Sequence, residues 1–309
     1  MDANPPTKRS PIWQFILLSR PFFLLGGVLF YALGVGIGHY LGVRLDWRAY
    51  LLGQACVTTL QLSAHYLNEY FDAPGDRSNP NRTPFTGGSG MLQEGRLARH
   101  VALMAAATTL TVGAVVTVLL LRDGYLSPPA MIILAIAFLG SFFYSVPPVR
   151  LVSSGYGELT TAILVSNLVP AFAFILQSGD LHRLVAMSTF PLTALMLAML
   201  LAFSLPDYAA DIRSGKRNLM VRIGWQNGMF LHNLLILLAY LLLGIAVIMG
   251  MPWRVIWPAF LTLPIGAFQI WQMVRIGAGA KPNWRALTVT ALALLATTAY
   301  LLTVAFWTA

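Results

Sequence analysis

The sequence predicts an all-α membrane protein, a single bundle of nine transmembrane helices around a central cavity that opens to the cytoplasmic side. Of the 309 residues, 57% are hydrophobic and only 10% are charged, which leaves too little polar surface to coat a soluble globule. Apolar runs of about 20 residues, long enough to cross a bilayer, recur along the whole chain. We therefore expect one integral-membrane domain over residues 1–309, with residues 1–10 as a short cytoplasmic segment before the first span.

The expected helices follow from the apolar runs taken in order. They cover residues 13–42, 48–72, 100–121, 126–146, 156–177, 184–208, 226–250, 253–275 and 285–307. The first run lacks the small-residue cleavage site that follows the apolar core of a secretory signal, so we expect it to be a retained span. The second and sixth runs end in acidic clusters, and each is followed by a loop rich in charge and glycine.

Turn-forming residues mark the remaining boundaries. These breaks are Arg122-Asp-Gly124, Ser127-Pro-Pro129, Pro147-Pro148, Ser178-Gly-Asp180, Gly250-Met-Pro252 and the segment from Gly277 to Pro282. Each lies between two apolar runs.

The distribution of Lys and Arg gives the orientation. An odd number of spans puts the two ends on opposite sides, and of the 20 Lys and Arg residues all but five fall on the N-terminal side. The exceptions are Arg44, Arg48, Arg122, Arg183 and Arg254. Because cytoplasmic loops carry the excess of positive charge, we expect a multi-pass protein of the cytoplasmic (inner) membrane with its N-terminus and both acidic clusters on the cytoplasmic side.

Composition excludes several classes of function. The net charge of +9 would suggest nucleic-acid binding in a soluble domain, but here the basic residues lie in short loops between spans, so we expect a lipid bilayer and no nucleic acid as partner. The single cysteine, Cys56, excludes an intramolecular disulfide and a thiolate metal cage. It lies inside an apolar run, where ordinary packing accounts for it.

Two acidic clusters at the ends of long apolar runs are the main functional signal. The chain has only eleven acidic residues, and five of them lie in Asn68-Glu-Tyr-Phe-Asp72-Ala-Pro-Gly-Asp76 and Asp207-Tyr-Ala-Ala-Asp211. A carboxylate within a membrane is unfavourable by roughly 2.5 to 3.5 kcal/mol at the bilayer centre and by less near the interface. Clustering therefore indicates a compensating cation, and two clusters that face each other predict a divalent metal.

A polar stripe runs along one face of the second span. Its members recur at intervals of three and four residues: Gln54, Thr58, Gln61, His65, Asn68 and Asp72. Hydrogen bonding to neighbouring helices is an alternative role, mainly for Gln54 and Thr58, and His65 is ordinarily a residue that bonds a neighbour. For Asn68 and Asp72 we expect a cavity, with Gln61 and His65 as acceptor or cavity residues. Pro74 predicts that the helix kinks or unwinds between Asp72 and Asp76.

The residue types favour magnesium. Aspartate and amide oxygens suit Mg²⁺, which keeps several waters and recruits phosphate oxygens, whereas no cysteine or histidine lies at the spacing of a zinc ligand. The predicted metal ligands are Asn68, Asp72, Asp76, Asp207 and Asp211. Asp207 and Asp211 share a helix face, four residues apart. Their alternative role is in surface ion pairs, which contribute little.

Basic residues beside the clusters balance the charge of a diphosphate. With two Mg²⁺ on four aspartates, a diphosphate ester leaves a negative excess that Arg82, Lys216 and Arg217 would cancel, so these residues and Asn68 are the candidate diphosphate ligands. Gly87-Gly-Ser-Gly90 offers backbone amides as an anion nest or acts as a hinge. Tyr144, in an aromatic segment before Arg150, belongs either to the site or to an interfacial anchor.

The motifs resemble those of the UbiA superfamily of intramembrane prenyltransferases, a nine-helix family that carries N-x-x-x-D-x-x-x-D and D-x-x-x-D motifs. The match covers essentially the whole chain: Asn68, Asp72 and Asp76 fit the first motif, and Asp207 and Asp211 fit the second. Tyr144-Ser-Val-Pro-Pro-Val-Arg150 is similar to the segment after the family's fourth helix.

Within the family, three segments look most like the 1,4-dihydroxy-2-naphthoate branch, which makes menaquinone precursors. They are Arg20-Pro21, Gly157-Glu-Leu159 and the run from Asp211 to Gly224. Phe203 and Ser204 stand where that branch usually has asparagines, and Pro206 replaces a common arginine.

The resemblance implies Mg²⁺-dependent transfer of a polyprenyl group from polyprenyl diphosphate to a small aromatic acceptor. Asp72 and Asp211 would be catalytic, and either is a candidate proton acceptor. Besides 1,4-dihydroxy-2-naphthoate, 4-hydroxybenzoate or another quinone, chlorophyll or haem precursor remains open as acceptor. The tail needs a non-aqueous trough, which Gly26, Gly27, Gly34 and Gly36 would leave room for, unless these glycines serve tight helix packing.

An ion-coupled membrane transporter is the competing class, because intramembrane acidic residues also mark ion paths. A transporter predicts carboxylates near mid-span within interrupted helices. Here the carboxylates gather at one interface beside cationic loops, which favours the enzyme.

Overall fold

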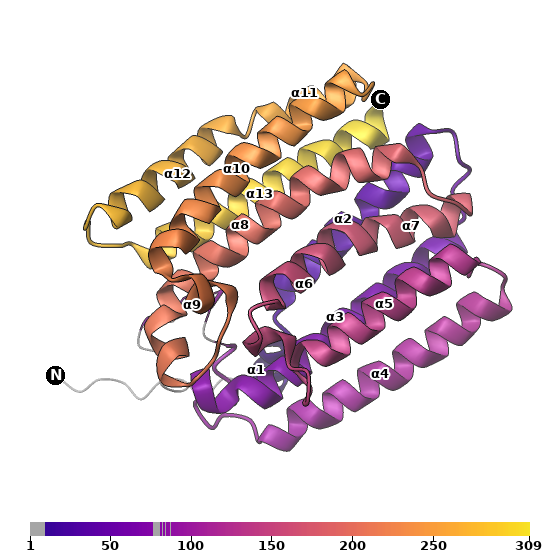
Figure 1. Ribbon diagram of the computed structural model, residues 1–309. Coiled ribbons are helices and arrows are strands. Elements are labelled where there is room, and N and C mark those ends of the chain that lie inside the picture. The colour runs from indigo at the N-terminus through magenta and orange to yellow at the C-terminus, as the bar shows by residue number, and fades with distance from the viewer. Residues whose placement is uncertain (1–9, 77–80, 82, 84, 87) are drawn as a thin grey trace.

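The computed structural model describes residues 10–76, 81, 83, 85, 86 and 88–309. Every regular element in this part of the chain is a helix, and the long helices run roughly alongside one another (Figure 1). The elements in chain order are α1 (Pro11–Leu18), α2 (Pro21–Tyr40), α3 (Trp47–Asp76), α4 (Arg99–Arg122), α5 (Pro128–Ser145), η1 (Leu151–Ser153), α6 (Gly157–Ile163), η2 (Leu164–Leu168), α7 (Val169–Ser178), α8 (Arg183–Arg213), α9 (Leu219–Ile223), α10 (Trp225–Ile248), α11 (Trp253–Phe260), α12 (Leu263–Gly277) and α13 (Trp284–Thr308).

Within the described residues, seven helical segments are long and apolar enough to cross a membrane. They are α2, α4, α5, the continuous segment from α6 through η2 to α7, α8, α10 and α13. The other two expected spans correspond to α3, which carries the polar stripe, and to the pair α11 and α12. These helices pack in the same bundle, α3 against α4 and α5, α11 against α13, and α12 against α10 and α13.

The first expected span, 13–42, is broken in two. Ser10 caps α1 by accepting the amide of Trp13, and the chain turns at Arg20, whose backbone is left-handed with φ 51°. Pro21 then begins α2. Proline has no amide hydrogen to continue a helix but suits the first helical position, so a single uninterrupted helix was the wrong expectation here.

Proline has different effects elsewhere in the bundle. The expected span 253–275 is interrupted at Leu261–Thr262, with Pro258 inside α11 and a proline in the first turn of α12. By contrast, α3 stays helical to Asp76, so the unwinding expected after Asp72 is not observed. In a membrane bundle, neighbouring helices and local adjustments can satisfy the backbone groups that a proline frees.

The glycines of α2 separate into two kinds. A Cβ at Gly34 would lie 2.1 Å from the carbonyl oxygen of Pro170, and one at Gly36 would lie 2.7 Å from Nε1 of Trp307. At Gly26 nothing lies within 4 Å of that position. Gly34 and Gly36 therefore pack tightly against the backbone of α7 and a side chain of α13, as the packing alternative predicts. Gly27 lies close to the side chain of Gln61, whereas Gly26 borders open space.

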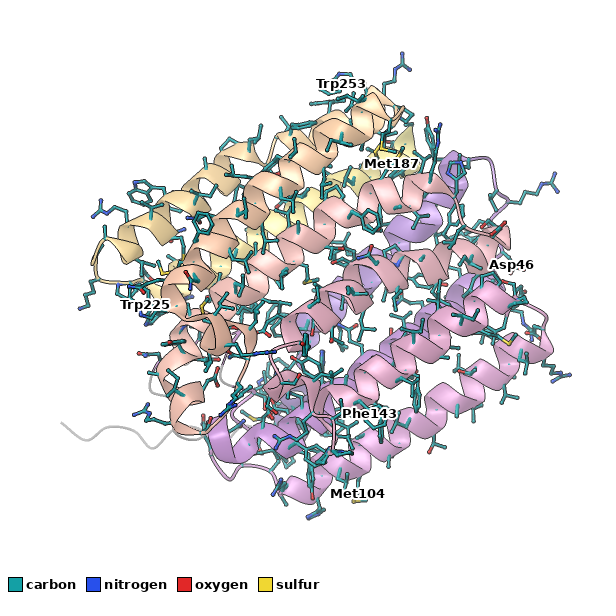
Figure 2. The ribbon with its side chains drawn as sticks, in the orientation of Figure 1. Asp46, Met104, Phe143, Met187, Trp225 and Trp253 are labelled. Atoms are coloured by element: carbon teal, nitrogen blue, oxygen red, sulfur yellow. The ribbon has the colours of Figure 1, made fainter. Side chains whose placement is uncertain are left out.

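The two ends of the bundle differ. α1 and α9 lie at the same end, and the C-terminus lies at the other, together with the connections from α2 to α3, from α4 to α5, from α7 to α8 and from α10 to α11 (Figure 1). Asp46 and Trp225 mark the two ends among the side chains (Figure 2). The five Arg residues that oppose the charge bias all belong to these connections or to the helix ends beside them.

Candidate active site

A cavity of about 530 Å³ opens at the end of the bundle that holds α1 and α9. Its walls come from α2, α3, α5, the segment from α6 to α7, α8 and α13, and from the chain just before α4. Most polar side chains gather toward one end of this cavity: Arg20, His65, Asn68, Asp72, Thr86, Ser141, Tyr144, Glu158, Thr161, Ser204, Asp207, Asp211, Lys216 and Asn218. Gln61 also lines the cavity but lies deeper along α3. The remaining walls are mainly apolar.

The two acidic clusters meet on this cavity although more than a hundred residues separate them. The end of α3 carries Asn68 and Asp72 into it, and the end of α8 carries Asp207 and Asp211. Asp72 and Asp211 are each only 8% exposed. Spacings of four residues place each pair on one helix face, so the helical periodicity of α3 and α8 produces the carboxylate wall.

Asp72 is the centre of a charged network. Lys216 donates from Nζ to Oδ2 at 3.1 Å, and Arg150 donates from its terminal nitrogen to Oδ1 at 3.4 Å. Asn68 donates its amide to Oδ2 at 3.0 Å. The carboxylate is thus held by two cations from segments that are remote in sequence. Arg150 comes from the segment after α5 and Lys216 from the loop between α8 and α9, so Asp72 links both segments to α3.

Asp211 is held by the short helix α9. Asn218 caps α9 by accepting the amide of Val221 at 2.8 Å, and its side-chain amide donates to Oδ2 of Asp211. Glu158, at the start of α6, accepts the amide of Leu219 with both oxygens at 3.1 and 3.2 Å and the hydroxyl of Ser204 at 3.3 Å. Glu158 therefore fixes the segment that brings Lys216 and Asn218 to the aspartates.

A buried ion pair anchors the loop that follows α3. Glu69 is fully buried and pairs with Arg20, which donates from Nε at 2.8 Å and also from its terminal nitrogen. Ser89 donates its amide and its hydroxyl to the same carboxylate at 2.6 and 2.8 Å. Breaking a buried pair of this kind costs about 3 to 5 kcal/mol, so Glu69 joins α3, the turn before α2 and the loop into one unit.

The polar stripe of α3 divides between structure and cavity. Gln54 donates to Thr58 at 3.1 Å and neither lines the cavity. This bond lies within α3, so it is not the bond to a neighbouring helix that the alternative role expects. Gln61 and His65 do line it, and they also bond backbone carbonyls at the break between α1 and α2. Gln61 donates to the carbonyl of Phe23 at 2.6 Å, and the Nδ1 atom of His65 lies 3.1 Å from the carbonyl of Ser19.

Other expected site residues have different outcomes. Tyr144 lines the cavity and is not only an interfacial anchor. Arg217 is exposed and is not among the lining residues. It directly follows Lys216, whose side chain takes the inward position. Arg82, Gly87 and the side chain of Asp76 lie outside the described residues, and Gly88 lines the cavity.

Sequence reasoning did not assign a role to Arg20, Arg150, Glu158 or Asn218. Arg20, Arg150 and Glu158 lie within segments that carried the family resemblance. Glu158 had a signal of its own, because an acid inside an apolar run needs a partner. Asn218 lies in the run from Asp211 to Gly224 that also carried the resemblance, and its own signal was that of an N-cap residue before a short helix.

The donor set fits Mg²⁺. Carboxylate oxygens of Asp72, Asp207 and Asp211 and the amide of Asn68 line one cavity. Among the described residues, no three Asp, Glu, His or Cys side chains are grouped closely enough to hold a metal by themselves. Mg²⁺ is usually held by one or two carboxylates together with waters and substrate phosphates, so two facing clusters without a closed cage match that ion.

Comparisons with known proteins show the family and the fold of this chain. The model of the UbiA prenyltransferase family matches residues 28–292. A curated relative, the chloroplastic 2-carboxy-1,4-naphthoquinone phytyltransferase of Arabidopsis thaliana, is 31% identical over 147 residues. That match spans 44% of this chain and 38% of the relative, so less than half of either protein is compared.

Solved structures show the same fold. A UbiA homologue from Archaeoglobus fulgidus bound to DMAPP and Mg²⁺ has a TM-score of 0.66 at 16% identity and covers 94% of this chain and 99% of its own. The same homologue bound to GPP and Mg²⁺ has a TM-score of 0.61 at 14% identity, with the same coverage. A digeranylgeranylglyceryl phosphate synthase has a TM-score of 0.58 at 17% identity and covers 96% of both chains.

Proposed function

This chain belongs to the UbiA prenyltransferase family, and from that premise we propose that it transfers a polyprenyl group from polyprenyl diphosphate to a small aromatic acceptor. The observation that carries the proposal is the cavity itself. Asp72 and Asp211 lie with Lys216 at one end of it, and the remaining walls are mainly apolar. A charged head and an apolar tail on one molecule require these two environments side by side.

We propose that Asn68, Asp72 and Asp76 from α3 and Asp207 and Asp211 from α8 hold Mg²⁺. Homologues of the same fold bind Mg²⁺ together with DMAPP or GPP, and the oxygen donors of this cavity suit that ion. When bound, Mg²⁺ would neutralise the diphosphate and make it a better leaving group.

The chain's own residues orient the donor and stabilise charge on the leaving group. Lys216 reaches the cavity beside Asp72, where its ammonium is placed to stabilise charge that develops on the departing oxygen. The bond between the allylic carbon and the diphosphate oxygen breaks, and a bond forms between that carbon and the electron-rich ring. The ring then loses a proton to a base, for which Asp72 and Asp211 are the candidates. The surrounding apolar walls exclude water, which would otherwise capture the allylic carbon.

For the acceptor we propose 1,4-dihydroxy-2-naphthoate, as in menaquinone biosynthesis. The support is the segmental likeness around Arg20, Glu158 and Asp211 and the partial match to a naphthoquinone phytyltransferase. 4-Hydroxybenzoate and related ring precursors are the alternatives, and the assay below compares them directly.

We further propose nine crossings, with α3 and the α11–α12 pair as the two beyond the seven apolar segments, and a cavity that faces the cytoplasm at the inner membrane. An odd number of crossings agrees with α1 and the C-terminal end of α13 lying at opposite ends of the bundle (Figure 1). The excess of Lys and Arg at the cavity end supports the orientation.

The test is a transfer assay with purified protein, Mg²⁺, radiolabelled geranylgeranyl diphosphate and a panel of naphthoic and phenolic acceptors. We expect a prenylated product, and we expect Asp72→Asn and Asp211→Asn each to lower turnover by at least about 10²-fold, the scale of losing one preorganised electrostatic group. Asp180→Asn is the matched control, because Asp180 lies in the connection at the opposite end of the bundle. Full turnover in both site variants would exclude the proposed metal ligands, and ion flux without any prenylated product would favour a transporter.

A further inference from the structure

We propose that the cavity selects the length of the donor tail. Phe30, Phe172 and Met196 form its floor, and the space above this floor accommodates about four isoprene units. This inference rests on the proposed function. The cavity follows α3 from Asp72 to Val57 and α8 from Asp211 to Met196. Each stretch is about fifteen residues, so at the helical rise the cavity is roughly 22 Å deep, the length of about four to five extended isoprene units.

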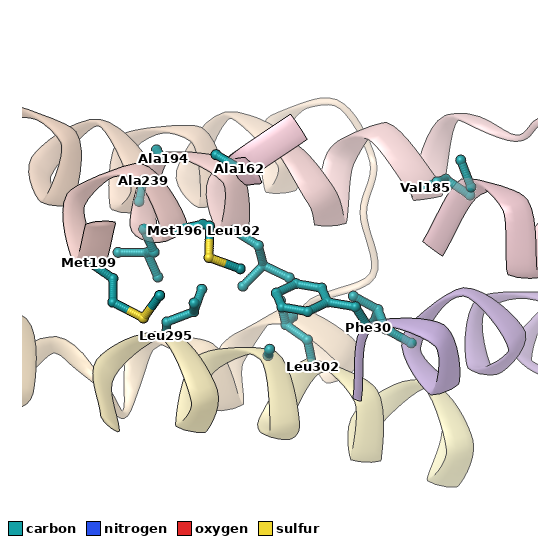
Figure 3. Packing of buried hydrophobic residues seen from close by; sticks show 14 of the residues in the cluster. Phe30, Ala162, Val185, Leu192, Ala194, Met196, Met199, Ala239, Leu295 and Leu302 are labelled. Carbon is teal, nitrogen blue, oxygen red and sulfur yellow. The ribbon is translucent and has the colours of Figure 1, made fainter. Parts of the chain in front are cut away.

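The floor is closely packed. Phe30, Phe172 and Met196 are 2%, 3% and 5% exposed, and each belongs to the main buried core while also lining the cavity. Beside Phe30 lie Leu192 and Leu302, two core residues that are fully buried (Figure 3). Interiors packed in this way have few voids larger than a water molecule, so a tail cannot pass the floor without displacing core side chains.

Close contacts of α2 with α7 and α13 close the region behind the floor. One turn beyond Phe30, Gly34 brings α2 against the carbonyl of Pro170, and Gly36 brings it against Trp307. The tightly packed half of α2 therefore begins where the cavity lining ends, and the open position at Gly26 lies on the cavity side. A tail that enters beside the aspartates thus runs along the N-terminal half of α2 and stops where the closely packed C-terminal half begins.

The volume and the side opening agree with a limit on length. About 530 Å³ lies in the range of pockets that hold one drug-sized ligand, which is the size of a diphosphate with about four isoprene units. Phe22 and Leu25 line the cavity and are also 71% and 63% exposed on the outer surface of α2. A longer tail would have to turn outward past them into lipid and would lose its contacts with the floor.

The experiment measures kcat/KM for farnesyl, geranylgeranyl, pentaprenyl and octaprenyl diphosphates with one acceptor. We expect a maximum at the geranylgeranyl or pentaprenyl donor and a value for the octaprenyl donor lower by about tenfold or more. Met196→Ala deepens the floor and should raise the ratio of octaprenyl to geranylgeranyl kcat/KM several-fold. Val57→Phe shortens the cavity and should move the maximum toward farnesyl.

Met273→Ala is the matched control, because Met273 is fully buried in the same core but does not line the cavity. It should leave the order of donors unchanged. An octaprenyl donor used as well as the geranylgeranyl donor by the wild-type protein would overturn the inference even if no variant folds, and so would a control that shifts the order as much as Met196→Ala. Absence of product with every donor would instead refute the proposed function.

Discussion

Arg20 and Arg150 are, among the described residues, the two non-glycine positions with left-handed backbone, at φ 51° and 43°. This conformation is unfavourable for residues with a Cβ and tends to persist where the surroundings enforce it, often at functional sites. Each arginine pairs with a carboxylate of α3, Arg20 with the buried Glu69 and Arg150 with Asp72. The backbone strain therefore coincides with the two cations that fix the cavity end of α3.

At Glu158 we predict a loss of turnover that reflects positioning. Its carboxylate holds the amide of Leu219, and the same short segment presents Asn218 to Asp211 and Lys216 to Asp72. A hydrogen bond to a charged group contributes about 1.5 to 3 kcal/mol, so Glu158→Ala should lower kcat by roughly ten- to a hundredfold and raise the Mg²⁺ concentration needed for half-maximal activity.

Glu158→Gln is the informative comparison, because it keeps one oxygen that can accept the Leu219 amide. It should recover most of the lost activity and restore the Mg²⁺ requirement. Equal losses in both variants would show that the negative charge of Glu158 matters and not its position. An unchanged Mg²⁺ requirement in Glu158→Ala would contradict the link to the aspartates.

The positions of the membrane helices were predictable from the sequence, but the breaks within them were not. Apolar length predicted the seven membrane segments that the structure contains, because a helix satisfies its own backbone groups in lipid. Their ends lie within a few residues of the expected ones, except that the first segment begins at Pro21 and not at residue 13. Breaks within a span were not predictable from proline alone. Pro21 begins a new helix after a left-handed Arg20, whereas Pro74 lies inside a continuing α3. The difference arises from tertiary contacts, which hydropathy does not contain.

Two glycines of α2 should respond in opposite ways to the same substitution. Replacing glycine by alanine inside a helix favours the helix by roughly 0.5 to 1 kcal/mol, and at Gly26 nothing opposes that gain. At Gly34 the new methyl group would meet the backbone of Pro170 at 2.1 Å, and overpacking of this kind costs about 1 to 3 kcal/mol or more. Thermal unfolding in detergent should show a lower Tm for Gly34→Ala only, and equal Tm values for both variants would contradict the close approach of α2 and α7.

The connection between α2 and α3 should make stability sensitive to acid. The hydroxyl of Tyr125 donates to Asp46 at 2.7 Å, and the amides of Arg48 and Ala49 donate to the other oxygen. These hydrogen bonds hold the pKa of Asp46 below its ordinary value, and the bond from Tyr125 has the largest effect. Ionised Asp46 therefore stabilises the folded protein fully at pH values above the pKa of an aspartate in the unfolded chain, which is about 3.9. This stabilisation is lost as the pH falls through the lower pKa that Asp46 has in the folded protein.

We expect the Tm of the wild-type protein to fall below about pH 4 more steeply than that of Asp46→Asn. Tyr125→Phe should lie between the two, because it removes the largest cause of the pKa shift and leaves the backbone bonds. Parallel pH profiles for all three proteins would show that Asp46 contributes nothing to the acid response. The effect should be small, because this exposed carboxylate is well solvated.

At the scale of the whole molecule, the cavity depends on helices that the sequence could not place beside one another. The motif spacing predicted the faces of α3 and α8, but the contribution of α6 through Glu158 and of the segment after α5 through Arg150 required tertiary structure. The same is true of the division of α2 into an open and a sealed half, since all of its glycines look alike in the sequence. Local periodicity fixes which face is polar, and packing fixes which faces meet.

The orientation of the bundle is open to a labelling experiment that this chain makes simple. Its one cysteine, Cys56, is 1% exposed, so a single introduced cysteine would be the only reactive thiol. Arg44 lies in the connection between α2 and α3 and Arg213 at the opposite end of the bundle, where α8 ends. Because positive charge accumulates on the cytoplasmic side, a membrane-impermeant maleimide should label Arg44→Cys in intact cells and Arg213→Cys only after the membrane is opened. The reverse pattern would place the aspartates outside the cytoplasm, and labelling of both sites in intact cells would contradict an odd number of crossings between them.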